Sequence, residues 1–325
     1  VVCAGSGGVG KTTVSAAIAL EAARRGRKTI VVTIDPAKRL ATALGLELGH
    51  EVSHVRPNLD AVMVDTKHAL DKMLKEYAPT PQRLDKIFAS PLYQHLSSAL
   101  VGSEEFAAMG LLHEYYTRGD YDLIVVDTPP ARHALDFLTV NTRLLGVFAS
   151  GLTQFLFKPG RLFSVAGGRV AKALSRWTSR EYLETLSEFM IHFEDMFYEM
   201  EGRVRTMDAL IRDGQRTSLA LVAVPEAGSV AEALSLADGV AELGLGITFG
   251  VANRTYLPIE GQGRGEGQGQ DVERVLLDHY ARLARMHAEG VQHLRERVPN
   301  VVVVPALTRV AGIEGVERLV PYLRQ

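Results

Sequence analysis

The sequence predicts an α/β fold, in which a doubly wound, mostly parallel sheet carries helices on both faces and is interrupted by helical insertions. Three observations support this prediction. An apolar run at 1–4 leads through a glycine-rich loop into a helix. Two further apolar runs, 29–34 and 121–127, each lead to an aspartate, and strands alternate with helices again after residue 217. Unbroken apolar runs of this kind are typical of parallel strands that are buried on both faces.

The composition limits the class of protein. The chain has 325 residues, of which 46% are hydrophobic, enough for one large α/β domain with a sizeable core. Its net charge of −2 gives no overall attraction for nucleic acid, so we expect no nucleic-acid partner. The single cysteine, Cys3, excludes an internal disulfide and is consistent with a cytoplasmic protein. No apolar run reaches the length of about 18 residues that a membrane span needs. Because the chain starts within a predicted strand and without Met, we expect that a short N-terminal piece is missing.

The glycine-rich loop at 5–13 is the first candidate site. It reads Gly-Ser-Gly-Gly-Val-Gly-Lys-Thr-Thr, which has the spacing G-x-x-x-x-G-K-T, and it precedes the predicted helix Lys11–Arg25. A strand, a glycine-rich loop and a helix in this order form a phosphate-binding loop, or P-loop. A chance glycine-rich turn is the alternative, but it would not account for the strand, the spacing, the lysine and the threonine together.

Each part of the predicted P-loop has a physical role. The glycines allow backbone N–H groups to turn toward a phosphate chain, and the helix N-terminus adds a partial positive charge. Lys11 can reach the β- and γ-phosphates, and the Thr12 hydroxyl can ligate Mg²⁺. The residues expected to bind the nucleotide phosphates are Gly7, Gly8, Val9, Gly10, Lys11, Thr12 and Thr13.

Two aspartates end predicted parallel strands. A carboxylate at the C-terminal end of such a strand lies on the ligand side of the sheet, which predicts a functional role for Asp35 after strand 29–34. Asp35 is equally suited to cap the predicted helix 37–44, and the two roles can coexist. Asp127 ends the strand 121–127 in a Walker-B-type arrangement. We expect it to hold Mg²⁺ through water, because Mg²⁺ keeps several waters and takes few protein carboxylates.

Two helical blocks break the alternation of strands and helices, and we interpret them as insertions at about 67–118 and 141–214 in a single domain that spans 1–325. The longest helix is predicted from Ser179 to Asp213, with apolar residues spaced by threes and fours. Four of the eight methionines of the chain lie between residues 190 and 207. Methionine suits apolar surfaces that accept varied partners, although a stripe of this kind more often indicates a helix-bundle core.

The alternating pattern resumes after the second insertion. The glycine-rich stretch 258–270 is predicted to be a flexible loop rather than a domain boundary. The other predicted elements are strand 218–224, helix 228–243, strand 246–252 ending at Asn253-Arg254, helix 271–297, strand 300–304 ending at Pro305-Ala306-Leu307, and helix 312–323.

These motifs together resemble those of the ArsA-type ATPases, which belong to the dimeric P-loop class with a deviant Walker A motif that also holds the MinD and ParA proteins. The resemblance covers nearly the whole chain. It is carried by the P-loop, by Asp35-Pro36-Ala37, by Asp127-Thr128-Pro129-Pro130 with His133, and by Asn253 and Pro305. Segments such as Asp65-Thr66-Lys67 look most similar to ArsA-like ATPases of actinobacterial type.

The resemblance implies a Mg²⁺-dependent ATP hydrolase with ATP and ADP as its nucleotides. In the family, the residue matching Asp35 begins switch I and positions the attacking water, which makes Asp35 and Lys11 the expected catalytic residues. Asp127 begins switch II and is, with Thr12, the expected metal ligand. The residues expected at the adenine are Asn253, Pro305, Ala306 and Leu307.

The resemblance also implies partners. The helical insertions of the family form an apolar groove for a client helix, so we expect a nucleotide-driven switch that binds a hydrophobic client or partner protein, or a membrane partner. We expect a homodimer, or a heterodimer with a related ATPase subunit. The ATPase subunit of an anion or metalloid pump is an alternative, although the lack of cysteines disfavours arsenite. A MinD- or ParA-like positioning ATPase is another, disfavoured by the large insertions and by the absence of a basic or amphipathic C-terminal tail.

One residue departs from the family in an informative way. Ser6 stands where the class has a lysine that reaches across a dimer to the nucleotide of the partner. A serine supplies no charge, so either another cation substitutes or the partner is a different subunit that carries the lysine. Lys38, Arg39 and Arg132 are the candidate substitutes, with solvated surface charge as their alternative role.

Overall fold

The computed structural model describes residues 1–35, 39–65, 104–149, 198–258, 270–307, 310 and 312–324. The chain divides into two compact units. The first, which we call the sheet unit, comprises Val1–Met63, Gly119–Phe137 and Arg212–Gln325. The second, which we call the helical unit, comprises Val64–Arg118 and Leu138–Ile211. Most of the two predicted insertions, residues 66–103 and 150–197, lies outside the described residues.

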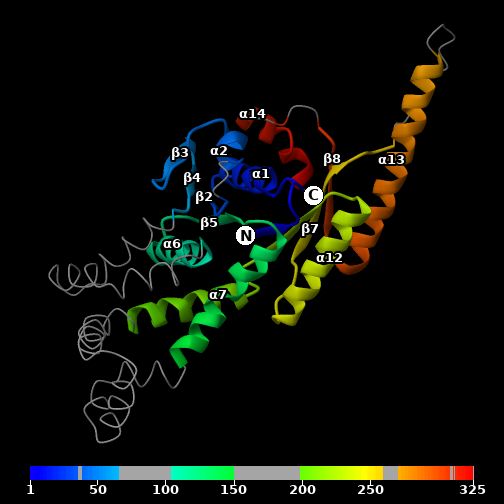
Figure 1. Ribbon diagram of the computed structural model, residues 1–325. Helices are drawn as coiled ribbons and strands as arrows, with labels where there is room; N and C mark the ends of the chain where they lie inside the picture. Colours follow the sequence, from blue (N-terminus) through cyan, green and yellow to red (C-terminus); the bar gives the residue numbers. More distant parts are fainter. Residues whose placement is uncertain are drawn as a thin grey trace, which may run out of the picture. The chain divides into compact units, whose positions relative to one another are not determined.

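The strands of the described residues form one eight-stranded sheet in the sheet unit (Figure 1). The order is β3-β4-β2-β5-β1-β6-β7-β8, and every neighbouring pair is parallel except β3 and β4. This arrangement confirms the predicted fold class. The strands are β1 Val2–Gly5, β2 Thr29–Thr33, β3 Ser53–Arg56, β4 Leu59–Met63, β5 Leu123–Asp127, β6 Leu219–Ala223, β7 Phe249–Thr255 and β8 Val301–Pro305.

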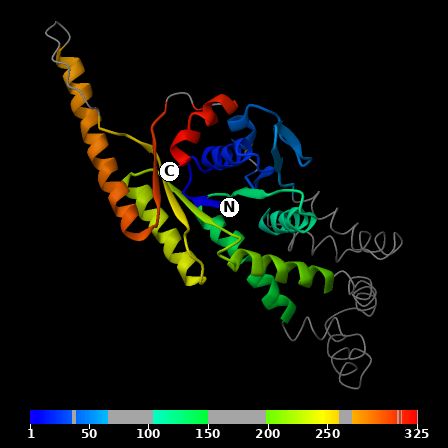
Figure 2. The same ribbon diagram turned by 180° about the vertical axis from the view of Figure 1, so that it is seen from behind.

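Helices cover both faces of the sheet. The helices α1 (Lys11–Arg24), α2 (Arg39–Leu44) and α14 (Gly312–Glu317) lie on one face, together with the 3₁₀ helix Val320–Arg324. Figures 1 and 2 show α12 (Ala227–Glu242) and α13 (Gln270–Arg297) on the opposite face, where they contact β6 and β7–β8 respectively. The central position of β1 brings the P-loop to the middle of the ligand edge.

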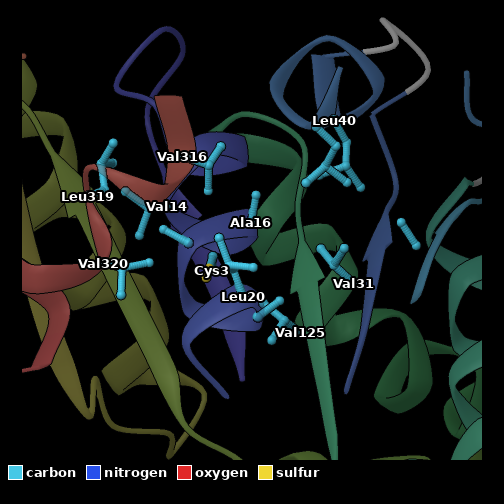
Figure 3. Packing of buried hydrophobic residues seen from close by; sticks show 14 of the residues in the cluster. Cys3, Val14, Ala16, Leu20, Val31, Leu40, Val125, Val316, Leu319 and Val320 are labelled. Atoms are coloured by element: carbon cyan, nitrogen blue, oxygen red, sulfur yellow. The ribbon is translucent and has the colours of Figure 1, made fainter. Parts of the chain in front are cut away.

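Helix α1 lies at the centre of a hydrophobic core in the sheet unit. Its residues Val14, Ala16 and Leu20 are buried and lie close to Cys3 and Val125 of the sheet (Figure 3). The C-terminal segment closes the same cluster with Val316, Leu319 and Val320. Complete burial of a leucine such as Leu20 contributes about 1.5–3 kcal/mol. The alanines of α1 allow the helix to approach the sheet, so the helix that begins at the P-loop is fixed along its length.

The structure corrects three details of the predicted elements. The edge strand β3 was not predicted; it pairs antiparallel with β4 across a tight turn in which Asn58 has a φ of 62°. Strand β7 runs on to Thr255, so that Asn253 lies within the strand, and its pairing with β8 is irregular there. The predicted helix 312–323 is divided after Glu317, because Pro321 has no N–H to continue an α-helix.

The described part of the helical unit contains α6 (Glu104–Arg118), the portion of α7 (Ala131–Ala149) after Phe137, and most of a helix at 198–212. Met200 and Met207 on the last helix are buried, as expected for a helix packed into a core. The other two methionines of the predicted stripe, Met190 and Met196, lie outside the described residues. Among the helices that the structure describes, none has both the length and the apolar character needed to cross a membrane.

The approach of α13 to the loop after β6 generates a first prediction. A Cβ added at Gly290 would lie 2.3 Å from the carbonyl oxygen of Pro225 and 2.8 Å from its carbonyl carbon. Backbone atoms cannot rotate away, so we expect Gly290→Ala to destabilise the protein by about 1–3 kcal/mol, as overpacking does. The measurement is chemical denaturation of the full chain.

A matched control is Gly110→Ala in α6, where no atom of the described part of the chain lies within 4 Å of the added Cβ. The same substitution there should be neutral or stabilising by up to about 1 kcal/mol, because alanine favours a helix. Equal unfolding free energies for Gly290→Ala and the wild type would show that α13 is not held against this loop.

Candidate active site

The P-loop is held in place by a residue from a distant strand. Asn253 of β7 donates from Nδ2 to the carbonyl oxygen of Val9 at 2.8 Å. The neighbouring Gly10 has a φ of 91°, and a Cβ at this position would lie 2.4 Å from Nδ2 of Asn253. Both the left-handed backbone and the close contact therefore require glycine at the last loop position before α1.

Lys11 lies over the loop rather than in solvent. Lys11 is the first residue of α1 and is only 6% exposed. Its Nζ donates a hydrogen bond to the carbonyl oxygen of Ser6 at 2.8 Å. Burial lowers the pKa of the Lys11 ammonium, while the nearby Asp127 carboxylate acts in the opposite direction. A phosphate chain on the loop would add negative charge beside this buried ammonium.

Asp127 is a buried carboxylate at the end of β5. Its Oδ2 accepts a hydrogen bond from the hydroxyl of Thr33 at 3.1 Å, because Thr33 and Asp127 face each other in the β2–β5 pairing. Burial raises the pKa of Asp127 to about 6, against the lowering effect of the Thr12 and Thr33 hydroxyls and of the Lys11 charge. Its other oxygen, Oδ1, is buried without a hydrogen-bond partner among the described residues.

These features fit a magnesium ion. An unpartnered carboxylate oxygen next to a threonine hydroxyl offers the oxygen ligands that Mg²⁺ prefers. Among the described residues, no three His, Cys, Asp or Glu side chains come together as a protein-only cage. Binding by one carboxylate, one hydroxyl and substrate phosphates is the usual arrangement for Mg²⁺ at a P-loop.

Asp35 is linked to Asp127 through the same threonine. The backbone N–H of Asp35 donates to the Thr33 hydroxyl at 3.3 Å, and that hydroxyl in turn donates to Asp127. The Asp35 carboxylate forms an ion pair with Arg39 at 2.9 Å, one helical turn later. Arg39, one of the candidate substitutes for the missing lysine, is thus already engaged with Asp35. The side chains of Lys38 and Arg132, the other two candidates, lie outside the described residues.

Ser6 packs as a neutral residue. It is 4% exposed, and its hydroxyl lies 3.4 Å from the hydroxyl of Ser229 at the start of α12. The Ser229 hydroxyl also accepts a hydrogen bond from the backbone N–H of Val224 at 3.1 Å. The position that carries a lysine in the related class is therefore occupied by a contact between two hydroxyls.

A cavity of about 640 Å³ extends from the P-loop along the ends of β7 and β8. This volume is in the range of small-molecule sites. The backbone N–H of Ala306 donates to the carbonyl oxygen of Thr255 at 2.9 Å, which holds the segment after β8 beside β7. The cavity brings together nine of the predicted nucleotide-binding residues, namely Gly7, Gly8, Val9, Gly10, Thr13, Asn253, Pro305, Ala306 and Leu307.

The remaining predicted site residues do not line this cavity. Lys11, Thr12, Asp35 and Asp127 belong to the group around Thr33 described above. Conversely, the cavity includes residues that no sequence motif assigned to it, among them Arg254, Tyr256 and His287. Arg254 and Tyr256 follow Asn253 directly and could have been found by extending that strand. His287 lies on α13, and nothing in the sequence relates it to the loop.

Comparison with known proteins identifies the family of this chain. Residues 1–266 match the family model described as anion-transporting ATPase. An ATPase GET3 of Malassezia globosa is 26% identical over 328 residues, covering 99% of this chain and 89% of that protein. A putative arsenical pump-driving ATPase of Halobacterium salinarum is 30% identical over 257 residues, covering 78% of this chain and 34% of that protein.

A third relative, an uncharacterized protein of Streptomyces coelicolor, is 36% identical over 141 residues, covering 43% of this chain and 36% of that protein. The family match spans the P-loop, both aspartates and Asn253. The chain therefore belongs to the ArsA family of anion-transporting ATPases and is an ATP-hydrolysing enzyme.

Proposed function

We propose that this ATPase is a Mg²⁺-dependent conformational switch, which uses ATP hydrolysis to change how its helical unit binds a hydrophobic client or partner protein. The observation that best supports the proposal is the group around Thr33. A buried carboxylate with one unpartnered oxygen, a buried lysine and the P-loop lie together at one edge of the sheet. This edge continues into a cavity large enough for a nucleoside.

In this mechanism the chain binds and orients the nucleotide. The backbone N–H groups of the P-loop, the N-terminus of α1 and the Lys11 ammonium bind the phosphates. The Thr12 hydroxyl and, through water, Asp127 would hold Mg²⁺. When bound, the metal neutralises charge that develops on the phosphates. Asp35 would orient the attacking water, and its ion pair with Arg39 would have to open or turn for that purpose.

The connection between the aspartates and the helical unit supports the switch. The Thr33 hydroxyl donates to Asp127 and accepts from the backbone N–H of Asp35. A displacement of one aspartate would therefore alter the hydrogen bonding of the other. Helix α7 begins at Ala131, four residues after Asp127, and the division between the two units falls within it, after Phe137. A displacement of the segment after β5 would pass into the helical unit along one continuous helix.

The ATPase subunit of an anion pump is the second candidate, because the family model and several relatives carry that description. A pump for a soft metalloid would use thiolates. The single cysteine, Cys3, is buried, and burial raises the pKa of its thiol to about 11. The chain itself thus offers no thiolate for such a substrate, which favours the client-binding switch.

A first test concerns phosphate binding by Lys11. Its ammonium would form charge-assisted hydrogen bonds to the phosphates, so we expect Lys11→Ala to weaken the affinity for Mg-ATP by on the order of 10–100-fold. Isothermal titration calorimetry measures the affinity. Lys28→Ala serves as the control, because Lys28 lies over the Tyr121 ring at the amino end of the strands. Unchanged affinity in the Lys11 variant would contradict the P-loop assignment.

Substitution of the two aspartates should impair different steps of ATP hydrolysis. Asp35→Asn should bind ATP normally and hydrolyse it slower by a factor on the order of 10² or more, the usual effect of losing a catalytic group. Asp127→Asn should instead raise the Mg²⁺ concentration needed for half-maximal activity. Steady-state rates measured over a Mg²⁺ titration separate the two effects. Wild-type turnover by the Asp35 variant would show that the family role does not transfer.

The absence of the lysine at Ser6 predicts slow basal turnover in the proposed homodimer. Where an arginine finger supplies the equivalent cation, it accounts for roughly 10³–10⁵ in rate. We expect Ser6→Lys, a client, or a related subunit that carries the lysine to accelerate hydrolysis, as measured by phosphate release. Fast wild-type turnover that persists when Lys38, Arg39 and Arg132 are all replaced by alanine would contradict this expectation.

A further inference from the structure

We infer that His287 of α13 is a base-reading residue, which donates a hydrogen bond from Nε2 to a ring nitrogen of the purine of the bound nucleotide. The inference rests on the proposed binding of ATP. It adds to the base end of the site a residue from an element that carries none of the nucleotide motifs.

The position of His287 relative to the cavity is the first observation. Its side chain is only 1% exposed, yet it lines the cavity that also contains Asn253 and the segment after β8. The P-loop glycines line the same cavity. With the phosphates expected on the P-loop, a buried polar side chain in the wall of this cavity is available to contact another part of the nucleotide.

The hydrogen bond that His287 already makes determines which ring nitrogen can serve the ligand. The backbone N–H of Tyr256 donates to Nδ1 of His287 at 3.0 Å. A nitrogen that accepts from a backbone N–H carries no proton, so the proton of the neutral ring is on Nε2. Burial lowers the pKa of His287, against the opposite effect of Glu226, which favours this neutral form. The remaining polar group of the ring is therefore an N–H donor.

The ring is held in this orientation by its neighbours. The centroids of the Tyr256 and His287 rings are 5.1 Å apart. The Tyr256 ring also packs edge-on against the Tyr280 ring, with a centroid distance of 5.4 Å. One turn further along α13, Gly290 is in close contact with the Pro225 backbone, which fixes the depth of the helix. A donor that is oriented before the ligand arrives loses little entropy on binding.

The lining of the cavity suits the purine of the proposed ATP as the acceptor. The residues at the end of β8 and just after it that line the wall, Pro305, Ala306 and Leu307, suit the face of a flat aromatic ring. A purine presents ring nitrogens at its edge, and each accepts one hydrogen bond from an N–H donor. Phosphate oxygens are instead expected at the P-loop end, where the backbone N–H groups and Lys11 lie.

Two substitutions separate the two nitrogens of His287. His287→Asn keeps an acceptor near the position of Nδ1 for the Tyr256 N–H but has no donor that reaches the position of Nε2. His287→Gln keeps a donor near Nε2 and loses the acceptor. In the full chain with Mg²⁺, we expect H287N to bind ATP about tenfold more weakly, the usual effect of one hydrogen bond. We expect H287Q to stay within about threefold of the wild type, an effect smaller than that of one full hydrogen bond.

Tripolyphosphate is the probe without a base. Its affinity, measured by calorimetry or by competition, should be equal in the wild type, H287N and H287Q. ATP binding by H287N equal to that of the wild type would overturn the inference while leaving the proposed function intact. An equal loss for tripolyphosphate and ATP would also overturn it, because the role of His287 would then be structural. A wild-type protein that binds neither probe would refute the proposed function and this inference together.

Base analogues test the contact in the wild type itself. The 1-deaza, 3-deaza and 7-deaza analogues of ATP each lack one ring nitrogen. We expect one of them to bind the wild type about tenfold more weakly than ATP and to show no further loss in H287N, since the same hydrogen bond is missing in both cases. If all three analogues bind the wild type as ATP does, or if the loss is undiminished in H287N, the hydrogen bond does not exist.

Discussion

The ligand edge of this protein depends on the contact between Asn253 and the P-loop. One hydrogen bond, from Nδ2 of Asn253 to the carbonyl oxygen of Val9, joins β7 to the loop after β1, although the two residues are 244 positions apart in the sequence. The contact is so close that Gly10 has no room for a side chain. The P-loop and β7, which both line the cavity, are therefore joined by a direct contact.

A second connection joins the two aspartates. Parallel pairing of β2 with β5 places Thr33 opposite Asp127, and the threonine hydroxyl bonds both to the Asp127 carboxylate and to the backbone of Asp35. The hydroxyl satisfies only one oxygen of Asp127. The other is buried and unpartnered among the described residues, an arrangement that costs free energy unless a ligand compensates it. The sheet register therefore links the two aspartates through Thr33 and leaves one Asp127 oxygen without a partner among the described residues.

The sequence predicted those features that depend on local spacing. The P-loop, the strands that lead to Asp35 and Asp127, and the parallel sheet follow from apolar runs and glycine spacing, and the structure has them. It did not predict β3, because a four-residue edge strand leaves too short an alternation to detect. It also did not predict His287, since the place of His287 in the cavity depends on how closely α13 packs, and that is set by Gly290 and Pro225. The packing of distant elements has no periodic signal.

The surroundings of Ser6 indicate how this chain differs from a P-loop that carries a lysine there. Because Ser6 is buried and meets the hydroxyl of Ser229, the loop is closed by neutral groups on the side that faces α12. Among the described cations near the loop, Lys11 contacts the Ser6 carbonyl and Arg39 pairs with Asp35. Neither the Lys11 ammonium nor the Arg39 guanidinium can turn toward bound phosphates without leaving its present partner. Because Arg39 and Asp35 are joined by an ion pair, the positive charge available beside the loop depends on the positions of these two residues.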